Sequence, residues 1–271
     1  MRPDAPRKKG VARLAEIMGR DMWNFFRAGF LAFLGCLPFI IGMFFAVETH
    51  ALLFMLLAGI IGGLIAGPEL SAMADTVLRS LRDEPGYWWE TYRRVWKRNA
   101  RESLVPGMLT GLVLSMQIFT LFHMSVISAG IVTWVLLILS FVVTLGLESY
   151  IWPQIALLDL PLYGILKNSL LLFLGYLPRS LGAIAIKAVY WGAILLFFPL
   201  TTIILPFTNF WLPMLPALLC IYQPLNKCFT IESTINKMRE DELNAALAKD
   251  NEPLPEESTE ASSDDSSSDV Q

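Results

Sequence analysis

Long apolar stretches alternate with short basic blocks along this chain. No Lys or Arg occurs between Arg27 and Arg79 or between Arg101 and Lys167, and apolar residues fill both intervals. A membrane-spanning helix needs about 20 mainly apolar residues, so each interval is long enough to cross a bilayer and return. The pattern predicts an all-α, polytopic membrane helical bundle whose spans come in pairs.

We expect about six transmembrane helices within a transmembrane domain at 26–239. The expected spans are 26–47, 51–67, 103–122, 126–150, 181–205 and 209–222. Two more helices are expected at the cytoplasmic surface, because 84–102 is amphipathic and 161–177 is too short and too flanked by cations to cross. A basic amphipathic leader at 1–25 is expected to lie on the same surface.

Charge predicts the orientation of these helices. Hydrophobic residues make up 55% of the chain and charged residues only 17%, against about a quarter in soluble domains. The positive-inside rule places every basic block, and hence both termini, in the cytoplasm beside an anionic leaflet. An acidic tail at 240–271 carries 11 of the 24 carboxylates. Because it cannot bury enough apolar surface to offset its ordering entropy, we expect disorder from about residue 251.

The clearest amphipathic helix begins at Trp88. At 100° per residue its aromatic side chains share one arc and its cations lie opposite. The pattern predicts rings turned toward the hydrocarbon and cations on lipid phosphates, with Arg79 and Arg82 extending that surface. The aromatic residues are Trp88, Trp89, Tyr92 and Trp96, and the cations are Arg93, Arg94, Lys97, Arg98 and Arg101. Because this helix lies between two spans, we expect it to bind lipid headgroups and no nucleic acid.

Glu69, Glu148 and Lys187 are ionisable residues in or next to the expected spans. An intramembrane charge is costly and usually faces a partner, so we expect Glu148 and Lys187 to pair, either as a structural tie or in a transport role, unless they reach the surface separately. Glu69 follows Gly67-Pro68, where the second helix is expected to break and restart. Glu69 would then lie in the first turn of the new segment, either where the helix leaves the membrane or at a half-helix end that lines a polar cavity.

Residues for catalysis or metal binding are scarce. The sequence lacks the common catalytic and nucleotide-binding motifs and contains only two histidines, so we expect no enzyme and no cofactor. Glu48, His50 and His123 are expected together on the outer face, where a divalent ion or a pH response is conceivable but ordinary turns are the simpler interpretation. The three cysteines are not placed for a disulfide or a metal.

One segment resembles a known family. The sequence Ala66-Gly67-Pro68-Glu69-Leu70-Ser71-Ala72-Met73 is followed by an acidic turn at 82–87 and by an aromatic-basic helix that ends near Arg98-Asn99, with Leu37-Pro38-Phe39-Ile40 upstream. Over about residues 30–110 the chain resembles the YesL-like family of bacterial membrane proteins. It departs from that family by a longer apolar insert at 43–66 and by Glu69, where a small residue is usual. The resemblance implies a bacterial inner membrane and an accessory role in carbohydrate uptake, with no catalytic residues.

Three functions therefore remain open. The first is a non-catalytic accessory or assembly subunit beside a solute-uptake system, with transporter subunits as partners. The alternative is a self-contained small-solute transporter or channel with a path near Glu69, Glu148 and Lys187. The third is a lipid-sensing protein that acts through the helix at 88–101.

Overall fold

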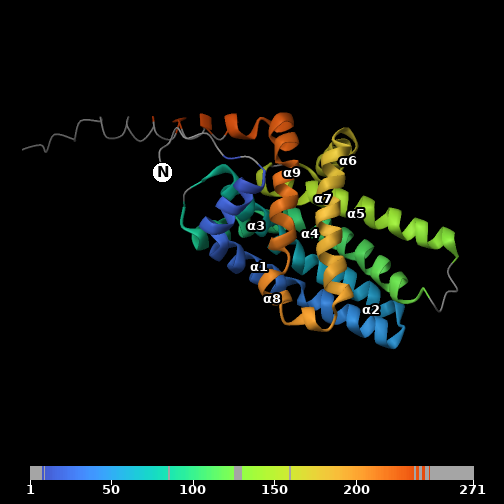
Figure 1. Ribbon diagram of the computed structural model, residues 1–271. Coiled ribbons are helices and arrows are strands. Elements are labelled where there is room, and N and C mark those ends of the chain that lie inside the picture. Colours follow the sequence, from blue (N-terminus) through green and yellow to red (C-terminus); the bar gives the residue numbers. More distant parts are fainter. Residues whose placement is uncertain are drawn as a thin grey trace, which may run out of the picture. The chain divides into compact units, whose positions relative to one another are not determined.

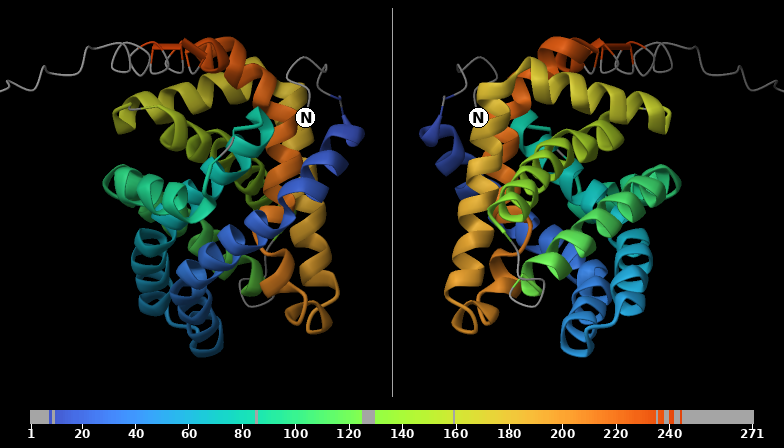
Figure 2. Two further views of the ribbon diagram at one scale, coloured as in Figure 1. Left: turned by 90° about the vertical axis from the view of Figure 1, so that its left-hand side faces the viewer. Right: turned by 90° about the vertical axis from the view of Figure 1, so that its right-hand side faces the viewer.

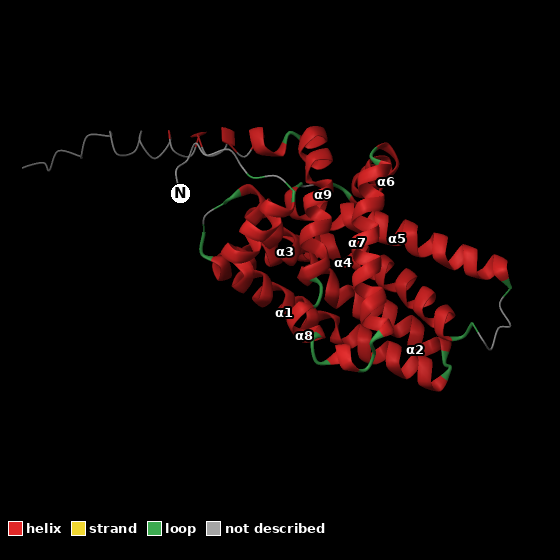
Figure 3. Ribbon diagram, in the orientation of Figure 1, coloured by secondary structure: helices red, strands yellow, loops and turns green. Residues whose placement is uncertain are grey.

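The computed structural model describes residues 8, 10–84, 86–124, 130–158, 160–234, 236–237, 240–241 and 244. Within these residues every regular element is a helix and there is no strand (Figure 3). The chain forms two units, Met1–Ile231 and Glu232–Gln271, and all the helices discussed below belong to the first. The predicted disorder from residue 251 concerns positions outside the described residues.

Among the described residues, the first unit contains nine α-helices and two short helical turns (Figure 1). In chain order they are α1 (Val11–Thr49), α2 (Leu52–Leu57), the π-helical η1 (Ala58–Gly62), α3 (Gly63–Arg82), α4 (Trp88–Phe122), α5 (Ile131–Leu157), α6 (Leu162–Gly175), α7 (Leu177–Leu196), the 3₁₀ turn η2 (Leu200–Thr202), α8 (Leu205–Thr208) and α9 (Trp211–Phe229).

Six stretches of helix are long and apolar enough to cross a membrane in the described part of the chain. They are α1, the run Leu52–Arg82, α4, α5, α7 and the run Leu205–Phe229. The predicted all-α fold and the number of spans are thus confirmed, and the chain is a multi-pass membrane protein. At 14 residues α6 extends about 21 Å, which is less than the hydrocarbon thickness of about 30 Å.

Two helices continue where the sequence suggested separate pieces. The leader and the first span form the single 39-residue helix α1, about 58 Å long. The helix expected at 84–102 and the span expected at 103–122 likewise form α4, of 35 residues. The prediction of a separate surface helix was therefore wrong. No Gly or Pro occurs between Trp88 and Val105, so the sequence has no residue that would end the helix there.

The second span also differs from the prediction. Helix α3 continues through Gly67-Pro68, so Glu69 lies in a helix interior and not at a restarted N-terminus. The irregularity lies earlier, in the π-helical turn η1. A proline costs one backbone hydrogen bond, and local π-type adjustments with neighbouring helices make that cost tolerable inside a membrane bundle.

Small residues bring α3 against α4. Gly59, Gly63 and Gly67 recur every four residues on the η1–α3 side, and the facing positions of α4 are Ser103, Gly107, Gly111 and Ser115. A Cβ atom on Gly111 would lie 2.5 Å from the carbonyl oxygen of Gly59 and 2.8 Å from Cα of Gly63. The two backbones therefore touch, as in other membrane helix pairs that pack through small residues.

Helix α1 packs on α3 and η1 in a similar way. A Cβ atom on Gly62 would lie 2.6 Å from Cα of Phe39, and one on Gly42 would lie 2.7 Å from Cβ of Ala58. Because α1 and α4 both approach α3 closely, nearly every residue of α3 from Ser71 to Arg82 is buried. Helices α5, α7 and α9 pack together beyond this group, with α7 beside α9 (Figure 2).

The two ends of the bundle differ in charge. One end, which we call the basic end, contains the start of α1, the end of α3 and the starts of α4 and α7, with Arg13, Arg79, Arg94 and Arg179 among its cations. The other, which we call the histidine end, contains His50 after α1 and His123 after α4. This alternation follows the spacing of the basic blocks in the sequence.

The close contact of α3 with α4 yields a test. Gly111→Ala places a methyl group against backbone atoms of η1 and α3, and overpacking of this kind costs about 1–3 kcal/mol. We expect a lower unfolding temperature in detergent or nanodiscs. The matched control is Gly182→Ala in α7, where a Cβ atom meets nothing within 4 Å. Because alanine favours helices, Gly182→Ala should leave stability unchanged or raise it by up to about 1 kcal/mol; equal effects of the two substitutions would contradict the close packing.

Candidate functional site: an apolar cavity around one ion pair

The predicted intramembrane pair meets in the structure. Nζ of Lys187 on α7 lies 3.8 Å from Oε2 of Glu148 on α5, and the two side chains are 9% and 17% exposed. Nε1 of Trp152 donates a hydrogen bond of 3.2 Å to Oε1 of the same carboxylate. Each charged residue lies about 15 Å along its helix from the basic end, so the pair lies deep within the spans.

The ion pair borders a cavity of about 400 Å³. Residues of α1, α3, α4, α5, α7 and α9 line it, and Glu148 and Lys187 are the only charged side chains among the described lining residues. Most of the wall is aliphatic or aromatic, for example Phe33, Leu70, Leu114, Leu145, Trp191 and Met214. A cavity of this size and lining is typical of a small-molecule site, in which few polar groups fix the orientation of the ligand.

A polar contact next to the pair was missed by the sequence analysis. Nε2 of Gln117 on α4 donates hydrogen bonds to the hydroxyls of Ser140, at 2.5 Å, and Thr144, at 2.8 Å. Ser140, Thr144 and Glu148 follow one another every four residues on α5, so this contact lies one turn beyond Glu148. It ties α4 to α5 on the side of the ion pair toward the histidine end. The i, i+4 spacing was visible in the sequence, but the partner on α4 was not.

Glu69 lies in a separate environment. Its carboxylate accepts hydrogen bonds from the hydroxyl of Tyr92, at 2.5 Å, and from Nε1 of Trp96, at 2.9 Å. Its Cγ packs where a side chain on Gly35 of α1 would be. Glu69 is not among the described residues that line the cavity. The predicted path that joins Glu69 to the ion pair is therefore not a single cavity in this structure.

The aromatic side chains of α4 also lie in different environments. Tyr92 is buried and bonded to Glu69, Trp96 donates to the same carboxylate, and Trp88 is half-buried, with its ring 5.7 Å from the Arg27 guanidinium. The prediction that all four rings face lipid was therefore wrong for Tyr92, because Glu69 needs donors inside the bundle. Trp89 remains exposed.

The cations on the opposite arc of α4 also differ from one another in their contacts. Arg98 donates hydrogen bonds to the carbonyl of Ala156 near the end of α5, at 2.8 Å, and to Oδ1 of Asn99. Arg98 thus caps a carbonyl near the C-terminus of α5, whereas the sequence predicted a contact with lipid. Arg98 is nevertheless exposed, as are the other four cations, and none of those four has an ion pair with a described residue: Arg93, Arg94, Lys97 and Arg101.

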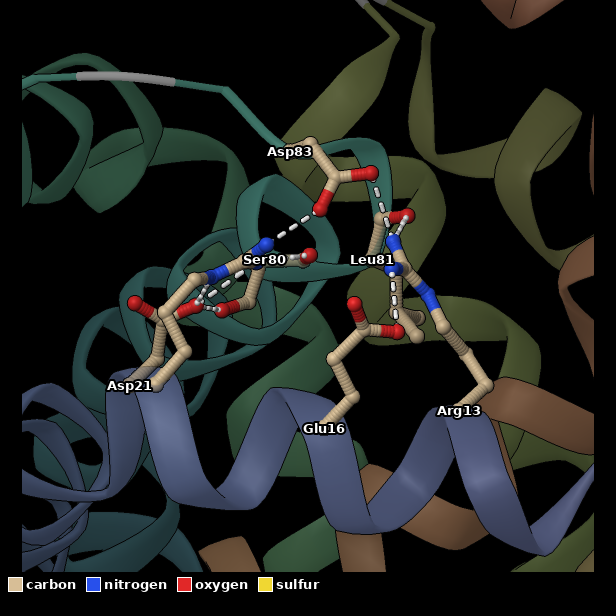
Figure 4. A network of polar contacts seen from close by, with 7 residues as sticks. Arg13, Glu16, Asp21, Ser80, Leu81 and Asp83 are labelled. Carbon is tan, nitrogen blue, oxygen red and sulfur yellow. Dashed lines mark hydrogen bonds and ion pairs between the residues drawn. The ribbon is translucent and has the colours of Figure 1, made fainter. Parts of the chain in front are cut away.

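A network of charges joins α1 to the end of α3 (Figure 4). Arg13 donates to Oδ2 of Asp83 at 2.6 Å and to the carbonyl of Leu81 at 3.1 Å, and it pairs with Glu16. Arg20 pairs with Asp83 and donates to the carbonyl of Ser80, at 2.8 Å. These groups cover the orphan carbonyls at the C-terminus of α3, where cations are favourable.

Arg79 and Arg82 belong to the same end of α3 and do not extend a lipid-facing surface as expected. Nε of Arg79 lies 2.7 Å from Oδ2 of Asp75, which is buried, and Nε of Arg82 lies 2.8 Å from Oε1 of Glu84. These ion pairs neutralise charges inside the basic end. Asp75 was not identified from the sequence, although its i, i+4 spacing to Arg79 is visible there.

The two histidines meet at the other end. Nδ1 of His50 lies 2.7 Å from Nε2 of His123, and Nδ1 of His123 lies 2.7 Å from the carbonyl oxygen of Phe119. The structure thus places the two residues together but orients their nitrogens toward each other. No group of three or more metal-ligating side chains occurs among the described residues, so the metal hypothesis gains no support. The three cysteines are free.

The comparisons with known proteins give no relatives. No family model matches this chain, no curated protein is similar to it, and no solved structure matches its fold.

Asp83 makes the ion-pair network sensitive to pH. Partial burial raises the pKa of Asp83, but the hydrogen bonds and charges of Arg20 and Arg13 outweigh it and hold the pKa below its usual range. A lowered folded-state pKa gives stability that is present above the unfolded pKa and is lost as the pH falls through the folded one. We expect Asp83→Asn to lower the unfolding temperature at neutral pH, with the deficit shrinking below about pH 4.

The control for this test is Glu102→Gln, which neutralises an exposed carboxylate at the same end of the bundle. Its unfolding temperature should follow that of the wild type at each pH. A deficit of Asp83→Asn that stays constant from neutral to acid pH would show that the network does not depend on the Asp83 charge.

Proposed function

We propose that the protein binds an apolar or amphipathic solute inside the membrane and carries it between the bilayer and the protein interior. The observation that supports this function is the cavity of about 400 Å³ around Glu148 and Lys187. Its volume lies within the range of about 300–1,000 Å³ that is usual for small-molecule sites. An apolar wall suits a hydrocarbon, and a single ion pair offers one polar attachment point.

The ion pair supports a functional role over a purely structural one. Burying two charges costs more than two well-packed apolar residues of similar volume would. A structural tie is expected to have short, fully satisfied contacts, yet here the two atoms are 3.8 Å apart at a cavity wall. This proposal retains the transporter alternative from the sequence but leaves Glu69 out of the path.

The second part of the proposal concerns the membrane in which the protein lies and its orientation there. We place the basic end in the cytoplasm of a bacterial inner membrane, with both termini on that side, because cations concentrate on cytoplasmic loops. The cations Arg93, Arg94, Lys97 and Arg101 then contact the phosphates of anionic lipids, since the described residues offer them no carboxylate.

The accessory role in carbohydrate uptake remains a prediction. It follows from the resemblance to the YesL-like family, and the contacts within this single chain do not bear on a partner subunit. A carrier and an accessory subunit differ in where the solute binds, so a direct binding measurement separates them.

Cavity filling tests the proposed site. Ala66 lines the cavity, and Ala66→Leu inserts a larger side chain into it. We expect the wild type to bind decanol saturably in native mass spectrometry after release from nanodiscs, and Ala66→Leu to bind it at least about tenfold more weakly, a loss of about 1.4 kcal/mol. The matched control is Ala193→Leu on the exposed face of α7, which should bind like the wild type. Equal binding by all three proteins, or none by any, would refute the site.

Charge reversal tests the lipid contacts. The double substitution Arg94→Glu and Lys97→Glu should abolish the rise in unfolding temperature that anionic lipid gives the wild type, because each surface cation contributes about 1 kcal/mol of attraction. Arg98→Gln is the contrasting control, since Arg98 bonds to the carbonyl of Ala156. It should lower the unfolding temperature in anionic and neutral nanodiscs alike. A double variant that still responds to anionic lipid would contradict the contacts.

A further inference from the structure

The two charges in the cavity have unequal sets of partners. Glu148 contacts two groups through different oxygens, with Oε1 accepting from Trp152 and Oε2 facing Lys187. Lys187 makes no side-chain hydrogen bond to a described residue, and its one ion pair spans 3.8 Å. An ammonium has three donors, and burial makes unused donors costly. The ammonium is thus the group that gains most from a new partner.

We propose that the cavity takes an acyl-chain carboxylate, whose anion binds the Lys187 ammonium while Glu148 takes up one proton. This inference rests on the proposed function, because it names the chemical class of the solute that the cavity binds. It adds a charge requirement that a purely apolar ligand would not have.

The charge balance of the cavity requires the proton. Before binding, one carboxylate and one ammonium give a net charge of zero. A bound anion would leave a net charge of −1 in apolar surroundings, which is costly unless a group is neutralised. Glu148 can take a proton on Oε2 while Oε1 still accepts the hydrogen bond from Trp152. The bound state then holds one ammonium, one ligand carboxylate and one neutral acid, again with a net charge of zero.

An amine would fit less well. A cationic ligand at Glu148 would compete with Lys187 for its ion-pair partner, and Lys187 would have to release one proton to keep the net charge at zero. An alcohol would fill the apolar space but would leave the ion pair as it is. The partners of the two residues therefore favour an acid over an amine or an alcohol of equal length.

The cavity also provides room for a chain. On α7 its wall runs from Lys187 through Trp191 to Leu195, about 12 Å along the helix toward the histidine end. Leu121 and Phe122, at the same end of α4, line it as well. A carboxylate at Lys187 would thus leave an apolar space for a medium-length hydrocarbon tail.

Three probes of equal length test the inference: decanoate, decanol and decylamine. Binding to the full chain in neutral-lipid nanodiscs is measured by calorimetry in buffers of different ionisation enthalpy, which counts the protons taken up. We expect the wild type to prefer decanoate and to take up one proton with it. Its affinity for decanoate should rise about tenfold for each unit by which the pH falls, while the ligand remains ionised.

Two substitutions assign the roles. Lys187→Met should remove the preference for decanoate over decanol. Glu148→Gln should bind decanoate at least about tenfold more tightly than the wild type, with no proton uptake and no pH dependence, because the ammonium no longer has a competing carboxylate. Unfolding temperatures show whether each variant is folded, and the proton count and pH dependence of the wild type need no variant.

The outcomes separate this inference from the proposed function. Saturable binding of decanol and decanoate with equal affinity would overturn the inference and leave the cavity as an apolar site. A preference for decylamine, or decanoate binding without proton uptake, would overturn it too. No saturable binding of any probe would overturn the proposed function itself.

Discussion

Close backbone contact between α3 and its neighbours α1 and α4 is the constraint on which the other features depend. Lipid tails are as apolar as leucine, so helices in a membrane associate through packing at short range, and here glycines and serines permit it. Gly62, Gly63, Gly107 and Gly111 also belong to the wall of the cavity. Their missing side chains leave room for the neighbouring helix backbone or for Phe39 of α1.

Buried carboxylates in this bundle are stabilised in three different ways. Glu69 accepts hydrogen bonds from two neutral donors, and Asp75 pairs with an arginine at 2.7 Å. Glu148 instead shares a cavity wall with an ammonium at 3.8 Å. The contacts of Glu69 join α3 to α4, whereas Asp75 and Arg79 pair within α3. The third has unused donors beside empty apolar space, which is why we assign ligand binding to it.

The sequence predicted some of these contacts and missed others for an identifiable reason. Glu148 and Lys187 were paired because few charges occur in the apolar segments and both fall at a similar depth. Tyr92 was expected to face lipid because helical periodicity shows which residues share a face, but not which neighbour that face meets. The hydrogen bond from Tyr92 to Glu69 joins residues 23 positions apart and depends on how α3 and α4 are rotated against each other.

The sequence by itself determined the class of protein, the number of spans and the end of the bundle on which the cations gather. These properties follow from local hydropathy and from the order of the basic blocks, which do not depend on how helices pack. Only the tertiary structure decided which arc of α4 turns inward, where the second span is irregular, and which residues enclose the cavity. Those features arise from close packing between helices, where the rotation and separation of each pair set the partners of every side chain.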